Sequence, residues 1–223
     1  NNINTALMDN IAVAWGNNKI ELKNLYNQLS RASVTVRNAL PDSNRGNQRS
    51  YVMSYESRAV YSTQLTGSHK SRDDSRRYTW SLGYTDMFRN LPDLRRISYY
   101  KQIDQSDSFY KAGVPVGAPD VNNGGGRVYS QLFEKTYAFS HQYTQKIKIG
   151  DYEFEGSIGN YIEQKGRAYN LRQFGYTIAS STPFLEKNRL LTTGINDIFA
   201  DSNVGAKNRF RIEENTLSTD KYD

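Results

Sequence analysis

The stretch from Tyr51 to Lys70 reads YVMSYESRAVYSTQLTGSHK and decides the fold, because apolar and polar residues alternate along it. The apolar positions are Tyr51, Met53, Tyr55, Ala59, Tyr61 and Leu65. After a polar turn over 71–76, the alternation resumes in Tyr78, Trp80, Leu82, Tyr84 and Phe88. A period of two residues predicts two long antiparallel strands, each with one apolar and one polar face.

Strand length and composition together favour a membrane barrel over a soluble fold. Strands of roughly twenty residues far exceed the usual length of about five or six. In a transmembrane barrel only every second residue meets lipid, which accommodates a mean hydropathy of −0.77 and a hydrophobic content of 37%. The 17 Tyr and 2 Trp suit the aromatic girdles of such barrels. A soluble β-sandwich, which also favours Tyr in strands, is the main alternative.

Charge and residue types exclude several other classes. The net charge is +6, but the basic residues are scattered, with Arg76–Arg77 and Arg95–Arg96 the longest runs, so we expect no nucleic-acid partner. The chain has no cysteine and therefore no disulfide or thiolate metal site. No run of eighteen apolar residues predicts a spanning helix. Asn1–Asn4 do not begin a signal peptide, so we expect an internal piece of a longer chain.

Short and long connections alternate between the predicted strands. The strands run over 5–15, 19–37, 51–70, 77–101, 128–149 and 152–180. Short turns are expected at 16–18, 71–76 and 150–151, and long loops at 38–50, 102–127 and 181–208. Transmembrane barrels show this asymmetry, with short periplasmic turns and long outer loops. A short helix is expected within 183–200, and a further strand begins at Phe210.

Aromatic residues cluster beside the short turns. We expect a membrane girdle at this interface, made of Trp15, Tyr78, Trp80, Tyr152 and Phe154. The alternation is broken by Asp9, Asn24 and Gln28, which fall on the predicted lipid face. A change of phase near Leu132–Phe133 predicts a β-bulge there.

Several segments carry a resemblance to a known family. They are ALMDN at 6–10, NKIELKNLYNQ at 18–28, YSTQLTGSH at 61–69, NLPDLRR at 90–96 and RAYNLRQFGY at 167–176. In these segments, spread over most of the chain in barrel order, the protein resembles the barrel region of TonB-dependent receptors from Bacteroidota. The segment at 90–96 is the most specific of them.

The resemblance implies a barrel of about twenty-two antiparallel transmembrane strands with a plug inside. Such receptors lie in the bacterial outer membrane and import scarce, bulky nutrients with energy delivered through TonB. The implied partners are membrane lipid and lipopolysaccharide, the plug, the remaining strands, the TonB complex and a surface lipoprotein lid. About six strands are visible here and cannot close such a barrel, so the plug and the TonB-contacting segment are expected upstream.

Polar residues opposite the predicted lipid face should point into the lumen. They are Glu56, Arg58, Gln64, Arg89, Glu153, Glu155 and Glu163. On the lipid side, a Lys or Arg at the bilayer midplane would cost roughly 2–4 kcal/mol. We expect these side chains to contact the plug or form salt bridges along the wall, in preference to direct contact with substrate.

The candidate ligand residues lie in the second long loop and in the end of the strand that leads into it. They are Arg95, Arg96, Tyr99, Tyr100, Phe109 and Tyr110. The aromatic rings suit stacking on a sugar or another ring-bearing ligand. The two arginines suit a carboxylate or phosphate, although a clamp between neighbouring strands is the preferred interpretation.

No catalytic or cofactor motif is present. His69 and His141 stand alone, and neither neighbours a Ser/Asp arrangement. The segment Asp120–Gly124 lacks the distal Glu of a calcium loop and is interpreted as an outer loop. We therefore expect no enzyme, cofactor or metal. The alternatives are a passive outer-membrane channel, an assembly or secretion component, and a soluble β-rich glycan-binding module.

Overall fold

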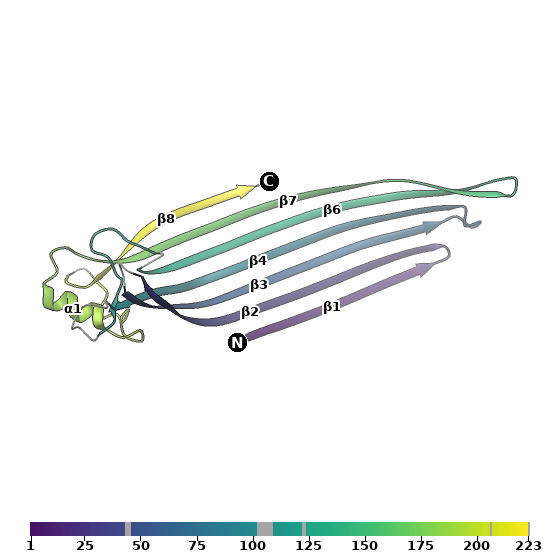
Figure 1. Ribbon diagram of the computed structural model, residues 1–223. Coiled ribbons are helices and arrows are strands. Elements are labelled where there is room, and N and C mark those ends of the chain that lie inside the picture. The colour runs from purple at the N-terminus through teal and green to yellow at the C-terminus, as the bar shows by residue number, and fades with distance from the viewer. Residues whose placement is uncertain (43–45, 102–108, 122–123, 206, 223) are drawn as a thin grey trace.

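The computed structural model describes the chain except residues 43–45, 102–108, 122–123, 206 and 223. It consists of one long, curved antiparallel sheet, with connecting loops and a short helix gathered at one end (Figure 1). The elements are β1 (Asn2–Trp15), β2 (Asn18–Asp42), β3 (Gly46–Lys70), β4 (Arg76–Lys101), β5 (Lys111–Ala112), β6 (Gly125–Ile149), β7 (Tyr152–Ile178), α1 (Phe184–Thr192) and β8 (Phe210–Tyr222).

The strands follow one another across the sheet in chain order. The order is β1-β2-β3-β4-β6-β7-β8, and the two-residue strand β5 pairs with β4 beyond the start of β6. The prediction of an all-β antiparallel fold is confirmed. Within the described residues the sheet does not close, because β1 pairs only with β2 and β8 only with β7. At 25 to 27 residues, β2, β3, β4, β6 and β7 each measure about 80 Å.

The strands reach further into the predicted loops than the sequence indicated. β2 and β3 stay paired to Asp42 and Gly46, so they occupy most of the predicted loop at 38–50; residues 43–45 lie outside the described part. Pro41 has no N–H to donate, and the ladder becomes irregular between Ala39 and Asp42. β6 begins at Gly125, three residues earlier than expected.

The three short connections are tight turns at the other end of the sheet (Figure 1). Gly16 and Gly150 open the first and third turns with positive φ angles of 54° and 61°, which glycine adopts without strain. In the second turn Asp74 adopts φ 54°. These turns fall within the predicted ranges 16–18, 71–76 and 150–151.

The register shifts lie in a different place from the expected bulge. β4 gains residues relative to β3 between Met53 and Ser57, and relative to β6 between Leu91 and Leu94. The β6–β7 ladder runs without a shift from Gly126 to Ile149, so the predicted bulge at Leu132–Phe133 is wrong. Pro92 explains the location, since a residue without an N–H is accommodated in a sheet at an irregularity.

A small core closes the loop end of the sheet. Ile97, Ile178, Leu190, Ile198 and Phe210 are fully buried there. The α1 helix supplies Leu190 and lies within the range 183–200 in which a short helix was predicted. Among the described residues, no helix is long and apolar enough to span a membrane.

Candidate functional site

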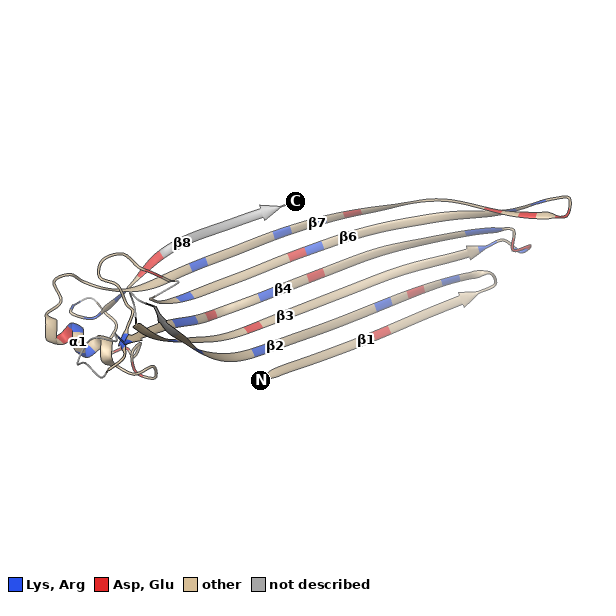
Figure 2. Ribbon diagram, viewed as in Figure 1, with Lys and Arg blue, Asp and Glu red and all other residues tan. Residues whose placement is uncertain are grey.

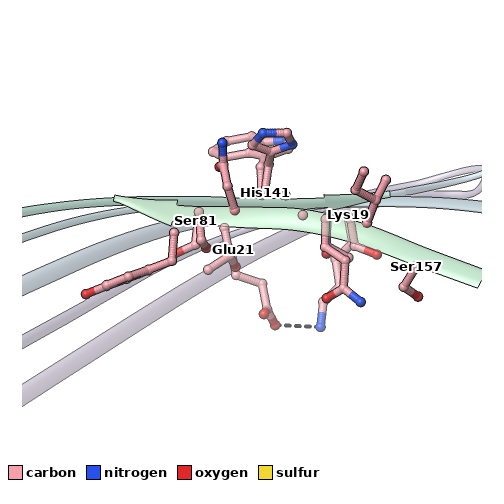
Figure 3. A pocket seen from close by; sticks show the side chains of 16 residues that line it. Lys19, Glu21, Ser81, His141 and Ser157 are labelled. Carbon is pink, nitrogen blue, oxygen red and sulfur yellow. Dashed lines mark ion pairs between the residues drawn. The ribbon is translucent and has the colours of Figure 1, made fainter. Parts of the chain in front are cut away.

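The sheet has two chemically distinct faces, and the register aligns them across the strands. The clearest row is entirely apolar: Ile11, Leu22, Leu65, Leu82, Phe139 and Ile162 lie opposite one another in turn. We call the side that carries this row the apolar face and the other side the polar face. Figure 3 shows the two sides near the turns, with His141 on one side and Glu21, Lys19 and Ser81 on the other.

The apolar face is open rather than packed into a core. Leu82 is 47% exposed, Tyr61 41% and Ile162 59%. Transferring such side chains out of water is worth about 1.5–3 kcal/mol each. An exposed apolar surface that extends over six strands is typical of a site that contacts a protein partner or a membrane.

Four tyrosines lie on the apolar face, on the loop side of the Leu65–Leu82 row. Tyr26 lies opposite Tyr61, and Tyr84 lies opposite Tyr137 two residues nearer the turns. The rings of Tyr84 and Tyr137 lie 5.2 Å apart, and those of Tyr61 and Tyr84 6.5 Å apart. The hydroxyls of Tyr26 and Tyr84 donate toward the loop end, to Gln28 (2.9 Å) and Asp86 (3.2 Å). An apolar ring with its hydroxyl directed away from the apolar band is the arrangement typical of a membrane interface.

The five predicted girdle residues share the apolar face but not one row. Trp15 and Tyr78 lie in the same row, and Trp80 lies in the next. Tyr152 and Phe154 lie four to six residues further along, because the β6–β7 hairpin extends beyond the other two.

Trp80 is held by its neighbours on β3. Its indole N–H donates to His69 Nε2 (3.0 Å), and His69 Nδ1 lies 2.8 Å from Asn18 Oδ1. Nε2 accepts, so this pattern fits a neutral ring that donates from Nδ1 to Asn18. The ring lies over Gly67, where an added Cβ would come within 2.2 Å of it. Sequence reasoning missed this contact, although a glycine within an alternating strand was a signal for it.

One expected exception on the apolar face is satisfied locally. Asn24 Oδ1 accepts hydrogen bonds from Thr63 (2.7 Å) and from Tyr61 (3.4 Å). Asp9 lies beside Asn24 on β1. The side-chain oxygen of Asn24 therefore has hydrogen-bond partners within the apolar face.

The seven residues predicted to face the lumen all lie on the polar face. Their positions alternate with the apolar rows in β3, β4 and β7. Arg58 lies directly opposite Arg89, and the Glu56 carboxylate bridges them at 2.5 Å and 2.9 Å. Such an arrangement matches the expected wall salt bridges, because directly opposed like charges destabilise a sheet unless a counter-charge intervenes.

Charge is distributed unequally between the faces. Between the turns and the β4 bulge, the polar face carries eleven basic and six acidic residues: Lys19, Lys23, Arg31, Arg58, Lys70, Arg77, Arg89, Lys146, Lys148, Lys165 and Arg167 against Glu21, Glu56, Glu134, Glu153, Glu155 and Glu163. On the apolar face the same span carries only Arg76, Lys135, Asp9 and Asp86. Figure 2 shows the charged positions along the strands.

The polar face is hollowed near the turns (Figure 3). The hollow has a volume of about 680 Å³, and short hydroxyl side chains line it, among them Thr66, Ser81, Ser140 and Ser157. Lys19 and Glu21 form an ion pair of 2.5 Å at its margin. Small polar side chains leave room for solvent or a hydrophilic solute against the sheet.

The predicted ligand residues gather at the loop end, but not as one exposed platform. Tyr99 is 6% exposed, meets Tyr51 edge to face and donates to the Thr193 carbonyl (3.0 Å). Its ring is therefore part of the core and is not free to stack on a ligand. Tyr100 and Arg96 are half-buried.

The other candidates differ in their surroundings. Phe109 is 68% exposed, whereas the Tyr110 ring lies 5.1 Å from the Arg49 guanidinium carbon. Arg95 is paired with Asp93 at 2.7 Å.

A clamp between neighbouring strands was predicted for Arg95 and Arg96. In the structure, Asp93 of β4 forms such a clamp with β6. Arg127 of β6 binds both of its oxygens, with Nε 2.9 Å from Oδ1 and Nη2 2.7 Å from Oδ2. Sequence reasoning named Arg95 and Arg96 but missed Arg127, the residue that crosses to the next strand.

The second turn holds a carboxylate with a perturbed pKa. Ser71 and Ser75 hydroxyls both donate to Asp73, the latter at 2.7 Å, and together with the Ser75 amide they lower the pKa of that carboxyl to about 2. The two serines therefore account for the lowered pKa of Asp73.

In the part of the chain that the structure describes, no group of three or more His, Cys, Asp or Glu side chains could hold a metal ion.

Comparisons with known proteins add nothing to this description. No protein-family model matches the chain, and no curated protein matches its sequence.

Proposed function

We propose that this chain is part of the wall of an outer-membrane barrel that imports nutrients in a TonB-dependent manner. The apolar face contacts lipid, the polar face lines the lumen, and the loop end, with the exposed Phe109, faces outward and takes part in capture. Further strands and a plug would be supplied by residues outside this chain.

The observation that carries the proposal is the progressive stagger of the turns. The first hairpin ends at the row Trp15–Asn18. The second ends one residue beyond that row, at Lys70–Arg77, and the third six residues beyond it, at Ile149–Tyr152. Strands tilted by about 35–45° and spaced about 4.8 Å apart need a stagger of roughly one residue per strand to keep their turns at one height.

The stagger from the first hairpin to the third agrees with that requirement, whereas the second hairpin, two strand spacings from the first, is offset by one residue where about two to three are needed. Four strand spacings separate the first hairpin from the third, so a tilted wall would need about four to six residues of offset. The positions of the tyrosines shift in the same direction, because Tyr84 and Tyr137 on β4 and β6 lie two residues nearer the turns than Tyr26 and Tyr61 on β2 and β3. In a tilted wall, Tyr152 and Phe154 return toward the height of Trp15, which reconciles the girdle with its separated rows.

The two tryptophans give a direct test, because Trp15 and Trp80 both lie on the apolar face. The complete protein, with the strands that lie outside this chain and with any tryptophans there replaced by phenylalanine, is reconstituted in vesicles with lipids brominated on the acyl chains. We expect both tryptophans to be quenched, and the Trp80→Phe variant to keep the quenched signal of Trp15. A soluble β-rich module would show fluorescence equal to that in unbrominated lipid.

Energy coupling is tested separately in cells that carry the complete protein. A TonB-dependent importer loses uptake of its nutrient when a protonophore collapses the inner-membrane potential. A passive channel keeps its uptake, and that result would overturn the transport mechanism while leaving the membrane wall intact.

A further inference from the structure

Three carboxylates of the polar face share one arrangement, in which each lies between two cations. Glu21 lies 2.5 Å from Lys19 and 3.7 Å from Lys23, both on its own strand. Glu134 of β6 lies 3.2 Å from Lys165 and 2.5 Å from Arg167 on β7.

The third group lies between these two in the sheet. Glu56 of β3 lies 2.5 Å from Arg58 and 2.9 Å from Arg89 of β4. Arg31 of β2 is also opposite Glu56 in the register. The three groups, which we call the cation triads, therefore extend over β2, β3, β4, β6 and β7.

Each cation triad has one positive charge more than its carboxylate neutralises. The basic side chains remain accessible, with 50% of Lys23, 53% of Arg58 and 46% of Lys165 exposed. Exposed ion pairs are weak, so these cations can exchange their partner for a solute. A surplus of like charge also destabilises the folded state through repulsion. A purely structural ion pair would need only one cation for each carboxylate.

We infer that the polar face attracts and binds anionic solutes, those that carry carboxylate, sulfate or phosphate groups. This inference rests on the proposed function and names the substrate class that the wall favours. A surface with a surplus of basic residues, here eleven against six acidic ones, raises the local concentration of anionic solutes. The fork of an arginine such as Arg58 matches the oxygens of these groups.

The test uses the complete protein in uncharged detergent, with dextran sulfate and unsulfated dextran of equal length as probes. Binding is measured by calorimetry at several salt concentrations, with inorganic sulfate as a competitor. The triad variant carries Lys23→Gln, Arg58→Gln and Lys165→Gln, which leaves every carboxylate one cation. The matched control removes three cations elsewhere, through Arg76→Gln, Lys135→Gln and Arg172→Gln.

We expect dextran sulfate to bind, unsulfated dextran not to bind, and added salt to weaken binding. The triad variant should bind about tenfold more weakly, because three exposed contacts are each worth about twofold; the control should stay within twofold. Equal loss in both variants, or equal binding of both dextrans, would overturn the inference. If the triad variant does not fold, the three single variants, each expected to lose about twofold, carry the same test.

Two further outcomes separate this inference from the proposed function. Free inorganic sulfate that displaces the polymer at equal sulfate concentration would show a simple ion site and overturn the inference of a solute-binding wall. Selective binding of dextran sulfate by a chain whose tryptophans escape brominated lipid would support the anion-binding polar face and contradict the membrane location.

Discussion

Single residues decide how the apolar face is built, and Gly67 is the clearest case. The Trp80 ring occupies the space where a Cβ at position 67 would stand, and its N–H is held by His69. A glycine opposite an aromatic residue lets the ring lie flat across the neighbouring strand. The backbone of β3 and the orientation of Trp80 are thus specified together.

We predict that Gly67→Ala destabilises the protein by about 1–3 kcal/mol, because the new methyl group must displace the indole ring. The matched control is Gly156→Ala, where an added Cβ meets no heavy atom within 4 Å. Urea unfolding in detergent measures both variants. Equal midpoints for the two variants would contradict the packing assigned to Trp80.

For single residues, the sequence predicted the face of the sheet on which a side chain lies, but it did not predict the contacts that the side chain makes. The alternation assigned Leu65, Leu82 and Glu56 to the correct sides, because side-chain direction in a strand follows from parity alone. The burial of Tyr99 could not be predicted, since it depends on Thr193 and on a core assembled from distant segments.

At the scale of elements, β4 carries the irregularities of the sheet. It contains Pro92 and shifts register against both neighbours, and the Asp93 clamp lies at this position. The clamp restores a connection between β4 and β6 where the ladder is interrupted. The sequence placed the expected bulge on β6, at Leu132–Phe133, and not on β4. The position of a bulge depends on the register with the partner strand, which the pattern of one strand does not fix.

We predict that Asp93→Asn costs about 2–3 kcal/mol, because it removes a charge-assisted clamp and leaves Arg127 partly buried without its carboxylate. The side chains of Asp93 and Arg127 are only 22% and 29% exposed. The control is Glu214→Gln, which breaks the more exposed 3.4 Å pair with Arg172 and should cost under about 1 kcal/mol. A larger loss in the control than in Asp93→Asn would refute the clamp.

The second turn should respond to acid. The pKa of Asp73 is lowered to about 2, so its contribution to turn stability is fully present above its ordinary value near 3.8 and is lost as the pH falls through about 2. Carbon NMR titration of the Asp73 carboxyl measures this directly. The double variant Ser71→Ala, Ser75→Ala should return the midpoint toward 3.8, and an ordinary midpoint in the unmodified chain would show that the serines do not hold it.

At the scale of the whole molecule, the sheet is a curved wall with an apolar side and a cationic polar side. Its all-β character and the order of its long strands followed from alternation and turn spacing. The extension of β2 and β3 to Asp42 and Gly46 did not, because Pro41 and its polar neighbours have loop composition and only the pairing shows otherwise. The core at the loop end could not be predicted either, since its members come from six separate segments of the chain.

The most direct measurement of the wall uses the absence of cysteine from the chain. Single cysteines are placed in turn at Tyr61, Ser62, Thr63, Gln64, Leu65 and Thr66, and each variant is treated in membranes with a maleimide that cannot cross lipid. We predict that positions 62, 64 and 66 react and that positions 61, 63 and 65 react only after lipid is removed. Equal reaction at all six positions, or protection of the even ones, would contradict a sheet with lipid against its apolar face.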